Sequence, residues 1–187
     1  MLFTGLGGQG IQIASRTLAT AAIDEGRQVM LVPRYGGGMR GGMTNAELTV
    51  SDGPLRALPV ATAAWSAFVM DSSYWHTVRS RLAHHPVVLV NASLVTGTLD
   101  LAGATVWEVP ASSLAVEVAS PMSAVFVLLG AFAAVTGLVG TEAVVAAMRE
   151  LVPDYRTQHL EANERAIRAG AEALPALGSP AWTVPAA

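Results

Sequence analysis

A glycine-rich turn near the start of the chain is the first segment whose residue types and spacing could support chemistry. Residues 5–10 read Gly-Leu-Gly-Gly-Gln-Gly, the pattern G-x-G-x-x-G, between a short apolar segment and a helical one. Glycines let main-chain N–H groups approach a ligand, and the helix that follows adds positive potential, so the pattern suits a phosphate. Tight strand–helix packing without a ligand is the alternative. The candidate residues for binding a ligand or partner are Gly5, Gly7, Gly8, Gln9 and Gly10.

A dinucleotide site places a further demand on this pattern. It needs an acidic residue at the end of the second strand, where the carboxylate holds a ribose. Pro33-Arg34 follows the apolar run that predicts this strand, whereas Asp24 and Glu25 precede the run. Dinucleotide binding is therefore the weaker interpretation of the turn.

A second glycine cluster follows at residues 35–44. Five of the seven residues from Gly36 to Gly42 are glycines, with Met39 and Arg40 among them. Such a loop is tolerated when it packs against main chain or approaches a ligand closely. Arg40 could hold a phosphate or carboxylate through two parallel hydrogen bonds, and an ordinary ion pair on a partner-packed loop is an equal alternative. The candidate residues here are Tyr35, Met39, Arg40, Gly41 and Gly42, with Asn45 in the segment that follows.

Asn91 ends a near-continuous apolar run that predicts a buried strand. Open α/β sheets place their ligand crevices at the carboxyl ends of such strands, which makes Asn91 a candidate site residue. An Asx turn that closes the strand is the favoured alternative, because it needs no ligand. Asn163, farther along the chain, is predicted to be a surface or helix-packing residue.

The composition excludes several kinds of site. The chain has no cysteine, which rules out disulfides, thiolate zinc sites and cysteine-ligated iron–sulfur clusters on it. The net charge is −3 and no basic run occurs, so nucleic acid is not an expected partner. No serine has the context of an activated nucleophile, and the histidines lack metal-ligand spacing, so we predict no catalytic and no metal-binding residue. The four histidines are His76, His84, His85 and His159.

One long apolar stretch, Ala124 to Val139, lies in a segment without charged residues between Glu117 and Glu142. A membrane-spanning helix needs about 20 apolar residues and is usually flanked by basic and aromatic residues. This stretch is shorter and has no such flanks, so it predicts a buried or interface helix and no membrane contact. The N-terminus shows no secretory signal, so a cytoplasmic location is the expectation.

The alternation of apolar and helical segments predicts an α/β fold, a Rossmann-like doubly wound domain with a mostly parallel sheet and a helical C-terminal section. The first two strands and the helix between them predict a βαβ unit with a parallel pair. Pro33 is expected to stop the second strand, and Ala46, Leu48 and Val50 to share one face of an edge strand. The predicted strands are 1–4, 29–32, 45–50, 86–91 and 105–109, and the predicted helices are 11–25, 74–82, 142–151 and 157–173.

Residues 1–174 are predicted to form a single domain, followed by a Pro/Ala-rich tail at 175–187. The tail is expected to order only against a partner. Charged residues make up 13% of the chain, against about 25% in ordinary soluble domains. We therefore expect part of the surface to be buried in a partner.

Taken together, these motifs resemble the gamma subunit or gamma domain of the 2-oxoacid:ferredoxin oxidoreductases, which act on pyruvate, 2-oxoglutarate or ketoisovalerate. The resemblance spans about residues 1–170. Gly38 stands where the family usually has an acidic residue. The matching segments are 5–11, 35–42, 44–46, 51–52, 90–91 and 128–142, with Asn163, Ala166 and Gly170.

The resemblance implies a complex that oxidatively decarboxylates a 2-oxoacid with thiamine diphosphate and Mg, passes electrons through [4Fe–4S] clusters to ferredoxin, and releases an acyl-CoA. It implies that alpha and beta subunits bind the thiamine cofactor and that a cysteine-rich part, a delta subunit in some complexes, holds the clusters. This gamma-type chain is expected to carry no cofactor, and its two glycine loops to lie near each other and near the partners. A stand-alone dinucleotide-binding oxidoreductase and a non-enzymatic scaffold or nucleotide-sensing module stay open as alternatives.

Overall fold

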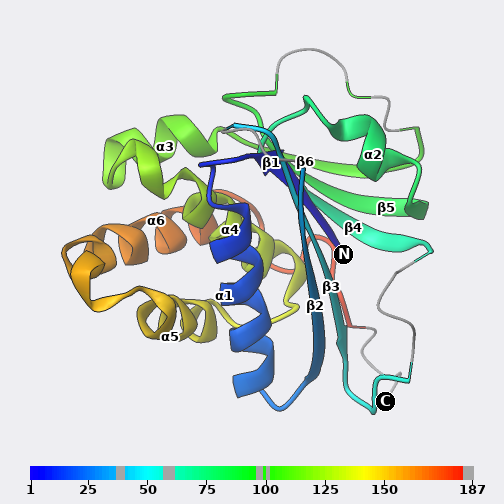
Figure 1. The fold of residues 1–187 in the computed structure, drawn as a ribbon, viewed down its shortest axis with the longest axis horizontal. Coiled ribbons are helices and arrows are strands. Elements are labelled where there is room, and N and C mark those ends of the chain that lie inside the picture. The colour runs from blue at the N-terminus through cyan, green and yellow to red at the C-terminus, as the bar shows by residue number, and fades with distance from the viewer. Residues whose placement is uncertain (37–40, 57–61, 96–98, 100–101, 183–187) are drawn as a thin grey trace.

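A six-stranded sheet carries the fold, with the strands in the order β2-β3-β1-β4-β5-β6 (Figure 1). The computed structural model describes residues 1–36, 41–56, 62–95, 99 and 102–182. The strands are β1 (Leu2–Leu6), β2 (Gln28–Tyr35), β3 (Met43–Ser51), β4 (Ala64–Val69), β5 (Leu82–Asn91) and β6 (Thr105–Val109).

One strand, β3, runs against its two neighbours. It pairs antiparallel with both β1 and β2, whereas the pairs β1–β4, β4–β5 and β5–β6 are parallel. The mostly parallel sheet that the sequence predicts is thus confirmed. The predicted pairing of the first two strands is wrong, because β3 turns back from β2 and lies between β2 and β1. For the same reason, the prediction that residues 45–50 form an edge strand is wrong.

The edge position belongs to β2, which continues through Pro33 to Tyr35. The expected stop at Pro33 is therefore wrong. An edge strand tolerates proline because one of its two rows of hydrogen-bonding groups has no partner strand.

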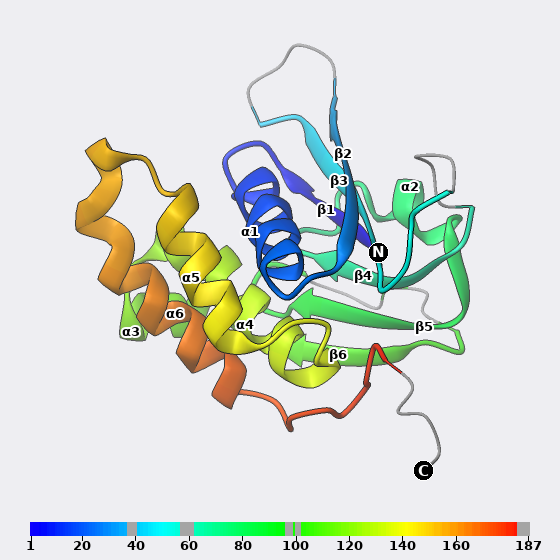
Figure 2. The same cartoon turned by 90° about the horizontal axis from the view of Figure 1, so that it is seen from below.

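Helices cover the two faces of the sheet unequally. On one face lie α1, α3, α4, α5 and α6, and the short α2 lies on the other (Figures 1 and 2). The larger apolar core lies under the five helices and includes Phe3, Phe68 and Leu89, whereas a smaller cluster joins Val69 to Trp75 of α2. The helices are α1 (Ile11–Asp24), α2 (Trp75–Arg79), α3 (Ala111–Val118), α4 (Ala124–Thr136), α5 (Thr141–Leu151) and α6 (Leu160–Glu172), with 3-10 turns η1 (Pro121–Ser123) and η2 (Asp154–His159).

The long apolar stretch forms α4, which lies inside the helical layer. Every residue of α4 except Ala134 is buried, so the predicted buried helix is confirmed. Within the part of the chain that the structure describes, no helix is both long and apolar enough to cross a membrane. Glycines allow α4 to pack closely on α6. A Cβ added at Gly130 of α4 would overlap the main chain of Ile167, and a Cβ added at Gly170 of α6 would overlap that of Val127.

The helical C-terminal section is confirmed, with small differences in its boundaries. Helix α5 begins at Thr141, one residue before the predicted start, and its N-cap is Gly140. The regular part of α6 begins at Leu160, because the 3-10 turn η2 takes the place of the first predicted helical turn.

The segment after Pro175 packs on the chain itself as far as Trp182. The N–H groups of Leu177, Ser179 and Ala181 donate to carbonyl oxygens at the end of α4, at 2.8, 2.9 and 2.7 Å. The indole N–H of Trp182 donates to the carbonyl oxygen of Leu138 at 3.1 Å. The expectation that the tail orders only against a partner is therefore wrong for residues 175–182, because α4 leaves carbonyl groups at its C-terminus that the tail satisfies.

Candidate functional site

The two glycine loops lie against each other at the ends of β1 and β3. The antiparallel pairing of Leu6 with Met43 brings the loops together. The N–H of Gly7 donates to the carbonyl oxygen of Gly42 at 2.8 Å. A Cβ added at Gly7 would lie 3.3 Å from the main-chain nitrogen of Gly41, closer than an ordinary side-chain contact. The expected proximity of the two loops is thus confirmed, and it depends on main chain packing against main chain.

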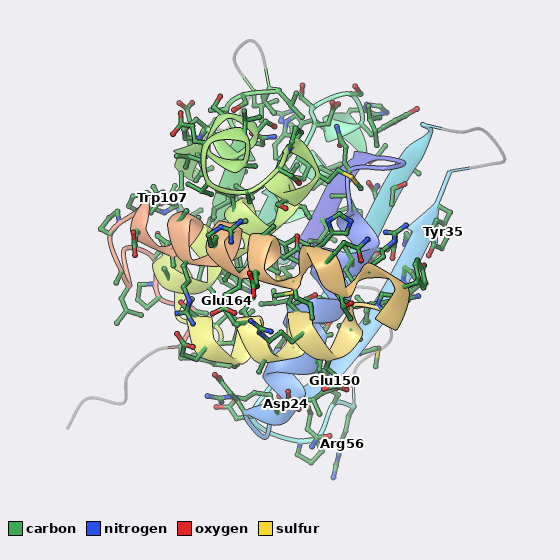
Figure 3. The ribbon with its side chains drawn as sticks, turned by 90° about the vertical axis from the view of Figure 1, so that its left-hand side faces the viewer. Asp24, Tyr35, Arg56, Trp107, Glu150 and Glu164 are labelled. Atoms are coloured by element: carbon green, nitrogen blue, oxygen red, sulfur yellow. The ribbon has the colours of Figure 1, made fainter. Side chains whose placement is uncertain are left out.

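A cavity of about 580 Å³ opens between the loops. No described residue that lines it carries a charged side chain. Tyr35 stands at the end of β2 with 65% of its surface exposed (Figure 3). The cavity is therefore shaped mainly by main chain and apolar groups. Its lining is Leu6, Gly7, Gly8, Gly10, Ile11, Gln12, Ile13, Tyr35, Gly36, Gly41, Gly42, Met43 and Thr44.

Gly10 joins the first loop to α1 in a way that only glycine accommodates well. Its φ of 80° lies in the left-handed region, which costs a residue with a side chain about 1 kcal/mol or more. A Cβ at this position would also lie 2.8 Å from Cγ1 of Val125 in α4. The third glycine of the pattern thus serves close packing of the turn against a helix.

The side chain of Gln9 forms hydrogen bonds that hold the first loop in place. Its amide oxygen accepts a hydrogen bond from the N–H of Leu6 at 2.8 Å, and its amide nitrogen donates to the carboxylate of Asp71 at 3.4 Å. Burial raises the pKa of Asp71, but hydrogen bonds from Ser73 and Gln9 outweigh it and hold the pKa below its ordinary value. Gln9 is therefore a positioning residue of the loop. Its partner Asp71 is 62 residues away, and no motif in the sequence connects the two.

Asn45 does not join the loop cavity, although it follows the second loop directly. Its side-chain nitrogen donates to the hydroxyl of Thr77 in α2 at 3.3 Å, on the other face of the sheet. Its main-chain carbonyl accepts a hydrogen bond from the side chain of Gln12 at 2.9 Å. Within the described residues, Asn45 ties β3 to α1 and α2.

Asn91 lies away from the glycine loops and is fully buried. Its side-chain oxygen accepts hydrogen bonds from the N–H groups of Ser93 and Ser112, both at 3.3 Å, and its side-chain nitrogen donates to the Ser112 hydroxyl at 3.0 Å. The bond to Ser93 is an Asx turn, the alternative that the sequence favoured. Asn91 thus joins the end of β5 to the start of α3. Met39 and Arg40, and with them Gly38, lie outside the described residues.

A buried carboxylate that the sequence did not indicate lies near the second loop. Glu47 of β3 is 4% exposed and accepts two hydrogen bonds of 2.6 Å from Arg81. It also forms an ion pair with Arg34 at 2.6 Å. Burial raises the pKa of Glu47, but the hydrogen bonds and charges of the two arginines outweigh it and lower the pKa below its ordinary value. The alternation of Ala46, Leu48 and Val50 was the signal that Glu47 faces the opposite side.

The donor groups of the chain decide which cofactors it could hold. Iron–sulfur clusters need thiolate ligands, and the sequence has no cysteine. The sequence therefore does not fit a cysteine-ligated cluster. Within the described ranges, no group of three or more histidine, aspartate or glutamate residues lies close enough together to hold a metal ion.

The fold is a Rossmann-like α/β module. The glycine-rich turn between β1 and α1 packs against the main chain of the second glycine loop. The family model described as "Pyruvate ferredoxin/flavodoxin oxidoreductase" matches residues 1–173. The chain belongs to this family.

Two related proteins are each named as one subunit of a larger enzyme. Pyruvate synthase subunit PorC of Methanothermobacter marburgensis is 31% identical over 153 residues, 81% of this chain and 85% of that protein. The pyruvate/ketoisovalerate oxidoreductases common subunit gamma of Thermococcus kodakarensis is 32% identical, covering 79% of this chain and 83% of that protein.

A solved structure of a gamma subunit has a similar fold. A keto/oxoacid ferredoxin oxidoreductase gamma subunit from Geobacter sulfurreducens superposes with a TM-score of 0.78 at 30% identity, over 92% of this chain and 93% of that one. The sequence resemblance to the gamma subunits is thus confirmed, and the chain is a gamma-type member of the family.

Proposed function

We propose that this chain is a cofactor-free gamma subunit of a 2-oxoacid:ferredoxin oxidoreductase complex, which it completes by packing on the alpha and beta subunits. The observation that carries the proposal is the hydrogen bond of 2.8 Å from Gly7 to Gly42, through which the first glycine loop packs against the described end of the second. A surface of bare main chain suits close contact with another polypeptide. The low share of charged residues supports the same conclusion.

In this proposal the redox chemistry belongs to the partners. Thiamine diphosphate, when bound in the complex, supplies the carbanion chemistry of decarboxylation. The alpha and beta subunits would bind it, and a cluster-binding delta subunit would pass electrons to ferredoxin. The gamma chain contributes packing and shape, in keeping with the absence of cysteine from its sequence.

A cation beside the glycine loops would strengthen a contact with CoA, because CoA carries phosphates. The described lining of the loop cavity contains no charged side chain. Arg40 is the candidate in the sequence for such a contact or for a partner carboxylate. Of the amides of residues 7–10, those of Gly7 and Gln9 already donate to carbonyl oxygens of the chain, so Gly8 and Gly10 are the candidates that are left. Replacement of Arg40 by alanine is then expected to weaken CoA use or assembly, and an unaffected complex would remove this role.

The identity of the 2-oxoacid is a property that we assign to the other subunits. The Thermococcus kodakarensis relative is named as a gamma subunit common to pyruvate and ketoisovalerate oxidoreductases. One gamma chain therefore serves two substrates in that organism, which supports a gamma subunit that does not line the substrate pocket.

The geometry argues against the dinucleotide alternative. In a nucleotide-binding βαβ unit the second strand lies beside the first, and the turn's N–H groups point at the pyrophosphate. Here β3 occupies that place, and the N–H of Gly7 already donates to Gly42. Titration of the purified chain with NADH or NADPH tests this, and we expect no energy transfer from protein tryptophan to the bound nicotinamide.

Purification of the tagged chain from its native host tests the assembly proposal. We expect recovery of a stable complex that contains thiamine-binding and cluster-binding chains and that reduces ferredoxin in the presence of a 2-oxoacid. Gly7→Val would disturb the loop contact and lower the yield of complex, whereas Gly53→Val, with nothing within 4 Å of its Cβ, is the matched control. Recovery of the wild-type chain alone would refute the proposal.

A further inference from the structure

A second cavity, of about 330 Å³, lies on the other side of the first glycine loop. It is formed by the starts of α1, α4 and α6 and by the segment that joins α5 to α6. It shares Gly8, Gly10 and Ile13 with the loop cavity. We call it the cationic groove, because Arg16 and Arg156 line it and no carboxylate among the described residues does.

The arginines of this groove differ from most others in the chain. All 11 basic residues of the sequence are arginines, and several are held by carboxylates. Arg27 pairs with Asp52, Arg81 with Glu47, and Arg168 with Glu142 and Glu164. Arg16 and Arg156 are both exposed, and neither forms an ion pair with any residue that the structure describes. Two guanidinium groups that have no ion-pair partner among the described residues thus share one hollow on a chain whose net charge is −3.

The remaining lining is apolar or already satisfied. Val125 and Phe126 of α4 form part of the floor. The hydroxyl of Ser123 donates to the side-chain oxygen of Asn163 at 2.9 Å, so these buried polar groups pair with each other. The groove therefore presents apolar surface in its interior and positive charge from its arginines.

Two large side chains extend this surface beyond the cavity. Met122 lines the groove with 75% of its surface exposed, and Tyr155, beside Arg156 in sequence, is 73% exposed. The guanidinium carbon of Arg156 lies 5.5 Å from the centre of the Tyr155 ring. Exposed methionine, tyrosine and arginine together are the composition of protein–protein contact surfaces rather than of ordinary surface.

We propose that the cationic groove docks an acidic segment of a partner subunit. A carboxylate of that segment pairs with Arg16 and Arg156, because guanidinium groups bind carboxylates through paired hydrogen bonds. Neighbouring apolar side chains of the segment cover Met122 and Tyr155. A polypeptide fits better than a small anion, because a small anion would leave both large side chains in water. This inference rests on the proposed function, since it names a contact that the gamma chain makes in the complex.

Charge reversal of the groove tests the inference in the assembled complex. The tagged double variant Arg16→Glu/Arg156→Glu is purified from the native host beside wild type and beside Arg56→Glu. Arg56 is also exposed and lies in a distant loop (Figure 3), which makes it the matched control. We expect the double variant to recover at least 10-fold less of the partner subunits. Arg56→Glu, and the conservative double variant Arg16→Lys/Arg156→Lys, should recover most of them.

Two further measurements separate the possible outcomes. Recovery by wild type should fall between 50 mM and 500 mM NaCl, and thermal unfolding of the isolated chain should be the same for wild type and the double variant. Equal recovery by wild type and the double variant would overturn the groove proposal and leave the proposed function intact. Pyrophosphate that stabilises wild type but not the double variant, with recovery unchanged, would assign the groove to a small anion and also overturn it. A wild-type chain that recovers no partner would overturn both proposals.

Discussion

The close contact between α4 and α6 makes a sharp prediction for Gly170→Ala. A methyl group at this position would lie 2.7 Å from the carbonyl carbon of Val127 and 3.0 Å from its Cα, and closer still to the carbonyl oxygen. Carbon atoms prefer separations of about 3.5–4.0 Å. The atoms in the way belong to main chain and cannot rotate aside. The two helices must therefore move apart by about 1 Å.

The magnitude follows from two opposing effects. Overpacking of a well-packed core costs about 1–3 kcal/mol and occasionally more, and a clash with main chain belongs at the upper end. Alanine in place of glycine inside a helix gains up to about 1 kcal/mol from helix propensity. We expect Gly170→Ala to lower the free energy of unfolding by about 2 kcal/mol. In a chain of this length that corresponds to a fall in Tm of about 4–8 °C.

Urea denaturation followed by circular dichroism measures this effect. Gly53→Ala is the control for the same chemical change in open space, and its effect should stay within about 0.5 kcal/mol. Gly130→Ala meets the main chain of Ile167 in the same way and should cost a similar amount.

The double variant Gly130→Ala/Gly170→Ala adds a second test. Because one separation of the helices relieves both clashes, the double variant should lose less stability than the two single losses combined. A Gly170→Ala chain as stable as wild type, or more stable, would refute the close approach of α4 and α6.

The other predictions concern the ion pairs, the first loop and the tail. Glu47→Gln should cost about 2 kcal/mol, since it leaves two partly exposed arginines without their carboxylate. Because the pKa of Glu47 is lower in the folded chain than in the unfolded chain, the unfolded chain binds a proton at Glu47 at a higher pH. Wild type should therefore lose more stability than Glu47→Gln as the pH falls from 6 toward 3 in urea titrations. Parallel curves of stability against pH would contradict this. Gly8→Ala and Gly10→Ala both place alanine at positive φ, but only Gly10→Ala meets Val125, so its Tm should fall further. Trp182→Phe removes the hydrogen bond to Leu138 and should lower the free energy of unfolding by about 1 kcal/mol. It should also speed amide hydrogen exchange at Ser179, and unchanged exchange would argue against the packed tail.

Structural features that depend only on residues close together in the chain could be predicted from the sequence. The run from Ala124 to Val139 is apolar except for Thr136, which predicted a buried helix because no face of it can meet water favourably. The Asx turn at Asn91 needs only the N–H two residues on. Both glycine loops could be recognised as unusual because each loop's composition is visible in a few consecutive residues.

Strand order and side-chain partners could not be read in this way. The position of β3 between β1 and β2 depends on which strands meet, and the sequence of β3 would suit either an edge or an interior place. Gln9 and Asp71 are 62 residues apart, and Glu47 and Arg81 are 34 residues apart. Nothing in either segment specifies the other.

Local sequence and composition set the kinds of surface that this chain has: two glycine-rich loops, one helix that is apolar except for Thr136, few charges and no thiol. The tertiary structure decided that Gly7 bonds to Gly42, that α4 meets α6 through glycines, and that Arg16 and Arg156 share one groove. The physical reason is that composition fixes what a segment can bury or bind. Which groups actually meet depends on long-range packing, where the free energy of the whole core selects one arrangement.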